Sequence, residues 1–522
     1  MNSRKLFQTP EWMAWIGALI SGIAAHAFAL VNILHNYDNI LQQPKGYGAG
    51  ITSGRWLLTV LGDFCQNILG MGYNLPVING LMYLVLIALS AAAVVRILKI
   101  RRKISAVLVG CLMATFPTVA ATMVFRYTAP YYGLSLLLSV LAVYFADKRR
   151  YGIFLSAFCL SLSMGLYQAY PPMTIALFVL ILMRDSMEED AKLQELILRG
   201  VRYCAALILG VVLYFLFLKL CLAAYSINGE VRLDSYQGIN TMGQISLSRL
   251  PGLILKAWFS AALFSVMDYC ELAATPILKI LWSLVIAGIL VTVVCTLIKK
   301  RVKLLLAVFC CLMGMLFPLA INFIVIMCPD GAVYTIMVYA FVLVGCAALM
   351  LLECLPESRG KTNSSMAGLT GILLALIVFC NSYYINHNYT SLYYANRQVE
   401  NFVNGLVLQA RMTEGYTPEA KWVFVGEMDK FSLYDMWYEV PYYGGIVGST
   451  GHGLFNATYS RDFWFRSYLG MSPRYASQEE QLAMQQDLRV QEMPCWPSEG
   501  SVQLIDEFLV VKFQEVSANV ND

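Results

Sequence analysis

The stretch from His35 to Asn39 contains residue types that could perform acid–base chemistry, and it directly follows a long apolar run. Its carboxylate, Asp38, could act as a general base on an acceptor hydroxyl, because such a base must lie within hydrogen-bond reach of the proton it removes. The alternative interpretation is a water-exposed residue in a helix C-terminal turn. The local spacing leaves both interpretations open.

An isolated arginine marks a second candidate position. Arg126 stands in the segment VFRYTAPYY, at the end of an apolar run where positive charge is otherwise avoided. A guanidinium group there can hold a phosphate through two parallel hydrogen bonds. Alternatively, the side chain reaches the lipid headgroups from an interfacial position. Arg55, in the same loop as Asp38, carries the same two interpretations.

The segment GLYQAYPPM places an amide and a phenol, Gln168 and Tyr170, at the end of another apolar run. Pro171 and Pro172 force the chain to turn before the next run begins. The two side chains could hydrogen-bond a sugar. They could equally belong to an aromatic belt and satisfy the backbone groups that the turn leaves free.

These positions must be held by membrane-spanning helices. Of the 522 residues, 58% are hydrophobic and 13% are charged, far below the roughly 25% charged residues of soluble domains. A run of about 20 apolar residues can span a hydrocarbon core about 30 Å thick. About eleven such runs predict a mainly α-helical, polytopic membrane protein. The runs lie near residues 12–34, 76–95, 104–125, 131–146, 151–170, 171–183, 201–225, 274–297, 304–328, 333–352 and 366–384.

The charges between the runs predict the orientation of the chain. Every second connection is basic, including 96–103, 148–150 and 299–303, and the positive-inside rule places these connections and the N-terminus in the cytoplasm. The other connections then face outward, among them two long loops, 36–75 and 226–271. Each long loop contains an apolar segment too short or too charged to span, which predicts a helix lying in the membrane interface.

The tail differs in composition from the rest of the chain. An odd number of spans places it outside, so residues 1–387 are predicted to form the transmembrane domain and residues 388–522 an extracytoplasmic domain. KWVFVGEM and SVQLIDEFLVVKF are short, rich in β-branched residues and bounded by Gly426 and Gly500, which predicts strands. With the aromatic, Gly-rich segment between them, they predict a small mixed α/β domain.

The composition also bears on partners and metals. A formal net charge of +4, from 37 Lys and Arg against 33 Asp and Glu, gives no polybasic surface for nucleic acid. The 14 cysteines include no CxxC pair, and the 4 histidines do not stand at zinc-finger spacing. We therefore expect no metal site and no nucleic-acid partner.

Several motifs give the chain a resemblance to a known family. They are YDN followed by SGRW near the first loop, FRYTAPYY, GLYQAYPP, and MPCWPSEGSVQLIDEFLVVKF near the end. In these segments the chain resembles the GtrII-type, serotype-converting glucosyltransferases of bacterial O-antigen modification, within the GT-C class of membrane glycosyltransferases. Each motif is short, but together they span most of the chain.

The resemblance implies a GT-C-like transferase in the bacterial plasma (inner) membrane. Such an enzyme takes a sugar, typically glucose, from a polyprenyl-phosphate donor at the outer face and attaches it to a hydroxyl of a glycan. The resemblance favours Asp38 as the base, with Asp63 as its nearest rival, and it makes Arg126 and Arg55 candidate ligands of the donor phosphate. The candidate substrate-binding residues are Tyr37, Asn39, Tyr127, Gln168 and Tyr170.

One departure from the family pattern affects the expected mechanism. Several members carry adjacent acids after the first helix, where this chain has Asp38 followed by Asn39. We therefore predict a metal-independent direct displacement without a cofactor, which inverts the anomeric centre. The implied partners are the lipid-linked donor, the glycan acceptor, the bilayer, and, acting alongside, a flippase and a polyprenyl-phosphate glucose synthase.

Two other functions fit parts of the sequence. A transporter or flippase of lipid-linked sugars would also have many spans, but such proteins place ionisable groups or broken helices near the bilayer midplane. A non-enzymatic assembly factor could use the aromatic stretch 442–464 to bind a partner. The polar loops and the tail lie on one predicted side, which favours an outward-facing enzyme.

Overall fold

The computed structural model describes residues 9–36, 47–72, 74–147, 151–229, 231–234, 246–355, 361–428 and 453–515. The chain divides into two compact units. One, here called the membrane unit, comprises Met1–Ile33 and Pro44–His387, and the other, the C-terminal unit, comprises Leu34–Gln43 and Asn388–Asp522.

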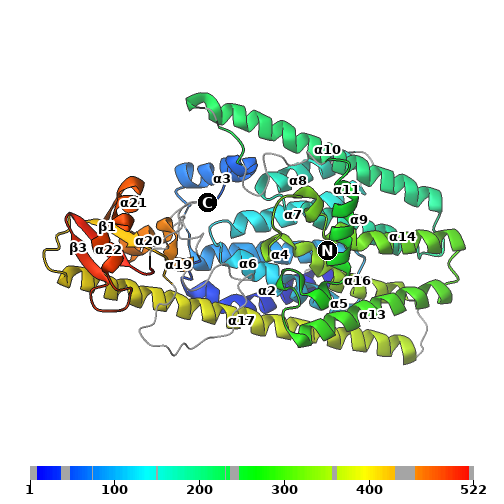
Figure 1. The fold of residues 1–522 in the computed structure, drawn as a ribbon. Coiled ribbons are helices and arrows are strands. Elements are labelled where there is room, and N and C mark those ends of the chain that lie inside the picture. Colours follow the sequence, from blue (N-terminus) through cyan, green and yellow to red (C-terminus); the bar gives the residue numbers. More distant parts are fainter. Residues whose placement is uncertain are drawn as a thin grey trace. The chain divides into compact units, whose positions relative to one another are not determined.

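The membrane unit is built from helices (Figure 1). Among the described residues, seven helices are long and apolar enough to cross a membrane, or eight if the bent pair α5 (Lys103–Ala114) and α6 (Pro117–Met123) is one span. The protein is therefore a membrane protein. The seven are α2 (Pro10–Val31), α4 (Pro76–Ile97), α7 (Ala129–Ala146), α10 (Leu193–Tyr225), α13 (Pro276–Lys299), α14 (Leu304–Ile321) and α17 (Lys361–Met412).

The predicted count of eleven spans is not confirmed. The three remaining predicted spans fall on shorter helices, which are α8 (Gly152–Leu166), α9 (Pro171–Asp185) and α16 (Leu343–Cys354). A 15-residue helix such as α8 rises about 22 Å, less than the roughly 30 Å of a hydrocarbon core. Length alone therefore does not qualify these three helices as spans.

Proline and threonine set the start of several helices. Pro10 and Pro276 occupy the first turn of α2 and α13, where the missing N–H has no intrahelical partner to lose. The preceding residues, Thr9 and Thr275, cap these helices by accepting hydrogen bonds from the backbone N–H groups of the first turn. The sequence therefore encodes these helix starts locally.

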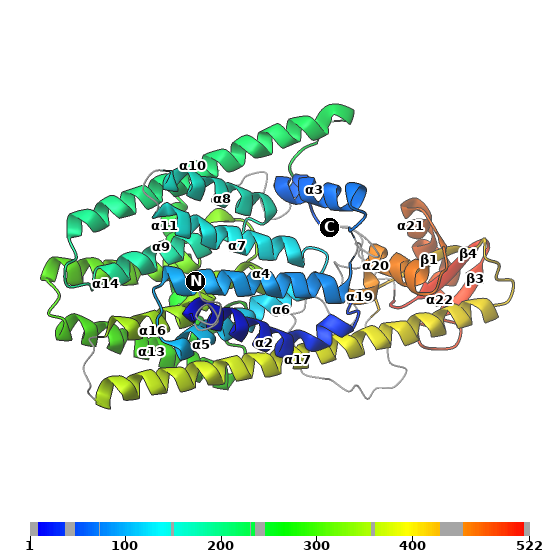
Figure 2. The same cartoon turned by 180° about the vertical axis from the view of Figure 1, so that it is seen from behind.

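Small residues let α2 and α5 approach closely, and Figure 2 shows these helices side by side with α4. A Cβ atom built on Gly110 would lie 2.0 Å from the carbonyl oxygen of Ala14 and 2.8 Å from the backbone nitrogen of Ala18. Such close backbone contact is typical of helices that associate in membranes through small residues.

The break between α5 and α6 leaves backbone carbonyls without helical partners. The helices are bent by 43° there. The Tyr339 hydroxyl donates to the carbonyl of Met113 (2.6 Å), and Nε2 of His26 lies 3.0 Å from the carbonyl of Ala114. Buried polar side chains thus satisfy the freed groups, as non-helical backbone inside a membrane protein requires.

The two segments predicted as interfacial are helical. The first forms α3 (Trp56–Asp63) and η3 (Phe64–Ile68), and the second forms α11 (Leu250–Ala262) and α12 (Phe264–Met267). Ile68 is 71% exposed, which fits an apolar side chain directed at lipid. Their location in the membrane interface stays a prediction. The remaining short helical turns are η2 (Ile51–Ser53), η4 (Ser226–Asn228), η6 (Tyr269–Glu271), α15 (Ile324–Met327), η7 (Thr335–Met337) and η8 (Tyr339–Val342).

The C-terminal unit contains a four-stranded mixed sheet in the order β2-β1-β4-β3. Strand β1 pairs in parallel with β2 and β4, and β3 pairs antiparallel with β4. The strands predicted from KWVFVGEM and SVQLIDEFLVVKF are confirmed as β1 and as the β3–β4 hairpin. The strands are β1 (Lys421–Val425), β2 (Arg474–Tyr475), β3 (Val502–Ile505) and β4 (Phe508–Lys512), and the helices are α19 (Gly453–Asn456), α20 (Thr458–Phe463), η9 (Trp464–Tyr468), α21 (Gln478–Gln486) and α22 (Leu488–Glu492).

Helix α17 continues well beyond its predicted apolar span. It has 52 residues, which corresponds to about 78 Å, more than twice a hydrocarbon core. The boundary between the two units, at His387 and Asn388, falls inside this helix. Beyond the boundary, Tyr389, Val399 and Val403 are buried, so α17 contributes to the core of the C-terminal unit.

Candidate functional site

The loop Ile51–Arg55 is fixed by two side chains from other helices. Nε2 of Gln168 donates to the carbonyl of Ser53 (2.8 Å), and the Tyr214 hydroxyl donates to the carbonyl of Gly54 (3.0 Å). Gln168 also donates to the Tyr214 oxygen (3.3 Å). These side chains are buried, so the amide that was predicted to bind sugar here holds the loop that presents Arg55.

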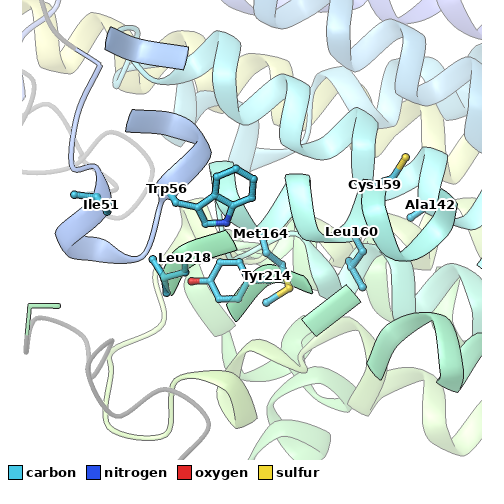
Figure 3. Packing of buried hydrophobic residues seen from close by; sticks show 8 residues of the cluster. All are labelled: Ile51, Trp56, Ala142, Cys159, Leu160, Met164, Tyr214 and Leu218. Atoms are coloured by element: carbon cyan, nitrogen blue, oxygen red, sulfur yellow. The ribbon is translucent and has the colours of Figure 1, made fainter. Parts of the chain in front are cut away.

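An apolar cluster lies next to this loop (Figure 3). Trp56 packs with Met164, Tyr214 and Leu218. A Cβ on Gly165 would lie 2.5 Å from the Trp56 ring, so only glycine lets the indole approach α8 this closely. The SGRW and GLYQAYPP motifs are therefore packed against each other.

The guanidinium of Arg55 is held by two stacked tyrosines. The Tyr132 and Tyr167 rings are 4.0 Å apart and nearly parallel. Arg55 donates from Nη1 to the Tyr132 hydroxyl (2.8 Å), and its Cζ lies 5.0 Å from the Tyr167 ring centroid. Both the hydrogen bond and the attraction between cation and ring favour one side-chain position. Residues of SGRW, FRYTAPYY and GLYQAYPP thus meet at one partly buried cation.

Tyr170 continues the row of rings behind Arg55. Its ring lies 5.6 Å from that of Tyr167 and 6.1 Å from that of Tyr339, both in edge-to-face geometry. Tyr170 is 1% exposed. The structure therefore places it inside the protein, with its ring supporting the Arg55 site.

Arg126 ties together the C-terminal end of α2 and the N-terminal end of α4. Its Nη1 donates to the carbonyl of Asn32 (2.8 Å), the residue that ends α2, and its own carbonyl accepts from Asn79 on α4 (3.2 Å). The side chain is 1% exposed, so it is not extended into solvent. The neighbouring Tyr127 packs against Gly48, where an added Cβ would lie 2.8 Å from the ring.

Asp63 accepts hydrogen bonds at both carboxylate oxygens. The donors are the hydroxyls of Tyr47 (2.9 Å) and Tyr225 (2.6 Å). Burial, together with the hydrogen bond to Asp63, raises the pKa of Tyr47 above its ordinary value of 10, so the phenol stays a protonated donor. Asp63 thereby connects α3 to the preceding loop and to the end of α10.

Arg55 and its partners Tyr132 and Tyr167 fall between residues 27 and 345, and this range, more than half of the chain, matches the family described as glucosyl transferase GtrII. The chain belongs to the GtrII glucosyltransferase family. The resemblance noted from the motifs is thereby confirmed, and membership implies glycosyltransferase activity. No protein of curated function and no solved structure matches this family member.

Tyr37, Asp38 and Asn39 of this glucosyltransferase lie outside the described residues. The residues just before them are described. Oδ1 of Asn396 accepts a hydrogen bond from the backbone N–H of His35 (2.7 Å), and its Nδ2 donates to the His35 carbonyl (2.9 Å). Within the described ranges, no three His, Cys, Asp or Glu side chains gather as metal ligands would.

Sequence analysis did not single out several residues that build the site. Tyr132 and Tyr167 lie within the FRYTAPYY and GLYQAYPP motifs, so the motifs were a usable signal. Tyr214 lies inside an apolar run, where nothing in the neighbouring sequence marks it as a site residue. The backbone N–H of Asp234 donates to the carbonyl of Thr52 (2.8 Å), which brings part of the second long loop to the first.

Proposed function

We propose that this protein transfers a glucosyl group from a polyprenyl-phosphate donor to a hydroxyl of a cell-surface glycan such as O-antigen. The reaction takes place at the outer face of the bacterial plasma membrane. Family membership supports glucosyl transfer, and the membrane-spanning helices suit a lipid-linked donor. The observation that carries the proposal is Arg55, fixed by Tyr132 and Tyr167 beside the loop Ile51–Arg55.

Arg55 is the main ligand of the donor phosphate in this proposal. A guanidinium has five N–H donors in a fixed planar arrangement that matches phosphate oxygens, and the bond from Nη1 to Tyr132 fixes the orientation of this plane. Fixed donors aimed at a departing phosphate stabilise the charge that develops there in the transition state. Arg126 is more deeply buried and acts mainly by holding the end of α2.

The transfer is a direct displacement. The acceptor oxygen attacks the anomeric carbon, the bond from that carbon to the phosphate oxygen breaks, and Asp38 takes the proton of the acceptor hydroxyl. The anomeric centre inverts, and no metal is needed because the phosphate leaves readily. Asp63 is the weaker candidate for the base, since both of its carboxylate oxygens already accept hydrogen bonds from tyrosine hydroxyls.

The experiment is glucosyl transfer by the purified full chain in proteoliposomes, from synthetic polyprenyl-phosphate glucose to a glycan extract. Asp38→Asn should lower kcat by about 100-fold or more, as removal of a general base does. Arg55→Ala should lower it by about 100-fold through loss of phosphate stabilisation. Asp330→Asn, at an exposed residue paired with Arg249, serves as the matched control and should keep full activity.

Three outcomes would contradict parts of this proposal. An active Asp38→Asn variant beside an inactive Asp63→Asn variant would move the base to Asp63. Reversible loss of transfer on chelation would refute the metal-free displacement. If the wild-type protein transferred no sugar from several lipid-linked donors, the transferase function itself would be refuted and transport of lipid-linked sugars would become the better hypothesis.

A further inference from the structure

Two connections of the membrane unit end their helices in the same strained way. Lys99 lies just beyond α4 and Arg301 just beyond α13, with φ angles of 55° and 48°. The backbone N–H groups of Arg301 and Val302 donate to the carbonyls of Ile298 and Leu297 (3.1 Å each), which is the Schellman motif. Glycine usually occupies the left-handed position of this motif, because it has no Cβ to clash there. The turn alone therefore does not account for a cation at either position.

Internal contacts account for the cation at Lys99. Its Nζ donates to the Glu188 carboxylate (3.0 Å) and lies 3.6 Å from Oδ1 of Asp185. Asp185 is the last residue of α9 and is 7% exposed. The charge of Lys99 thus stabilises a largely buried carboxylate and joins the end of α4 to the end of α9.

The cation at Arg301 has no such internal use. The preceding Lys300 donates to the carbonyl of Met187 (3.2 Å), which is the neighbour of Glu188, so this connection lies at the same end of the helices as Lys99. Arg301 is exposed, and its side chain has no hydrogen bond, ion pair or ring contact within the described residues. Its charge is therefore directed at the surroundings of the protein.

These surroundings include lipid. Ile298 is 70% exposed, and Leu304 and Leu305 are 78% and 68% exposed. They belong to α13 and α14, which are long and apolar enough to cross a membrane. Cations next to the end of an apolar span attract anionic lipid headgroups. The connection between the two helices contains four cations and no acid, and 96–103 contains five cations and no acid. The four cations are Lys299, Lys300, Arg301 and Lys303.

We propose that this end of the membrane unit binds anionic phospholipid, and that Arg301 presents its guanidinium to the phosphate of a lipid headgroup. A guanidinium can hold a phosphate through two parallel hydrogen bonds. This contact offsets the backbone strain at Arg301, since strained residues persist where function requires their geometry. The ligand is a lipid because exposed apolar side chains adjoin the cation and can pack against acyl chains. The inference does not depend on the transfer reaction.

The test compares full-length variants at Arg301. Arg301→Gln removes the charge and keeps the strained position, Arg301→Lys keeps the charge, and Arg301→Gly removes both the charge and the strain. The control is Arg466→Gln, which removes one exposed cation from the C-terminal unit and so changes the net charge equally. Phosphatidylglycerol and phosphatidylcholine are titrated separately into the detergent-solubilised chain, and native mass spectrometry measures the bound lipid.

We expect the wild-type protein to bind phosphatidylglycerol more tightly than phosphatidylcholine. Arg301→Gln and Arg301→Gly should bind phosphatidylglycerol about fivefold more weakly than wild type, the effect of one basic residue near an anionic headgroup. Arg301→Lys and Arg466→Gln should bind it with nearly wild-type affinity. In nanodiscs of phosphatidylcholine, Arg301→Gly should melt at or above the wild-type temperature, because glycine adopts the left-handed conformation without strain. Loss of binding in this variant then does not result from misfolding.

Three results would overturn the inference. The first is an equal affinity of wild type, Arg301→Gln and Arg301→Gly for phosphatidylglycerol. The second is an equal loss of affinity in Arg466→Gln, since net charge alone would then explain the effect. The third is displacement of the lipid by an equal concentration of glycerophosphate, which has the phosphate but no acyl chains. That result would show that the surface selects a soluble phosphate.

Discussion

At the scale of single residues, Tyr214 and Tyr203 lie on the same helix but anchor different parts of the membrane unit. Both lie on α10 and donate a hydrogen bond, Tyr214 to the carbonyl of Gly54 and Tyr203 to the Asp147 carboxylate (2.7 Å). Only Tyr214 touches the loop that presents Arg55. The two phenols are therefore a matched pair for separating support of the site from support of the fold.

Tyr214→Phe should weaken glucosyl transfer. The substitution removes the hydrogen bond to Gly54, so the loop carrying Arg55 loses one of its two side-chain anchors, and it removes one acceptor of Gln168, the other anchor. We expect kcat/KM for the donor to fall about tenfold, which corresponds to about 1.4 kcal/mol, near the usual value of a buried hydrogen bond. Donor-dependent transfer kinetics measure the effect.

The control is Tyr203→Phe. It should lower the melting temperature at least as much as Tyr214→Phe does, because the hydrogen bond that it removes goes to a charged group. Its kcat/KM for the donor should stay at the wild-type value. Equal losses of kcat/KM in both variants would show that Tyr214 acts through general stability, and the proposed support of Arg55 would then be wrong.

The site residues differ in how far sequence could predict them. Arg55 and Gln168 stand out as polar residues at the ends of apolar runs, and the structure brings them together through the backbone of Ser53. Sequence could not predict that Gln168 would bind backbone, because its partner lies 115 positions away. Nor could it identify Asn396, whose contact with His35 spans 361 positions.

At the scale of elements, the contact of α2 with α5 depends on the absence of a side chain. At Gly110, an added Cβ would meet backbone atoms of Ala14 at 2.0 Å, and backbone cannot move aside as a flexible side chain can. At Gly314 on α14, nothing lies within 4 Å of an added Cβ. Substitution by alanine should therefore destabilise the protein at Gly110 but not at Gly314.

Gly110→Ala should destabilise the membrane unit by about 1–3 kcal/mol, the usual cost of overpacking a tight contact. Gly314→Ala should be neutral or stabilise it by up to about 1 kcal/mol, since alanine has the higher helix propensity. Thermal unfolding of the detergent-solubilised chain measures both. A Gly110→Ala variant as stable as wild type would show that α2 and α5 can separate without cost.

Apolar runs predicted the positions of the long helices well, because about 20 consecutive apolar residues have few other stable environments. They did not predict the length of α17. The chain becomes polar after Tyr384, which was interpreted as the end of a span, but the helix continues because Tyr389, Val399 and Val403 are buried in the C-terminal unit. Tertiary packing, invisible to a hydropathy pattern, determines that extension.

At the scale of the whole molecule, ion pairs cluster in the C-terminal unit. Arg489 bridges Asp487 (2.7 Å) and Asp506 (2.8 Å), and Lys421 pairs with Glu480 (2.6 Å). Hydrogen bonds from Arg489 hold the pKa of both aspartates below the ordinary value, and the bond from Lys421 lowers the pKa of Glu480. The stability of this unit should therefore depend on pH.

The last prediction follows from the sign of these shifts. A carboxylate whose pKa is lower in the folded state stabilises the fold fully above its unfolded pKa, near 4, and loses that contribution as pH falls through the folded value. Calorimetry at low salt should therefore show that the melting temperature of the C-terminal unit falls as the pH is lowered below about 4. The fall should be shallower in Arg489→Gln, whose aspartates lose their partner.

The control for this prediction is Glu499→Gln. It changes an exposed acid outside this network and should keep the wild-type dependence of melting temperature on pH. Because the pairs are exposed, about 1 M salt should reduce the difference between wild type and Arg489→Gln. Identical slopes for these two proteins at low salt would show that the Arg489 bridge makes no contribution to folding.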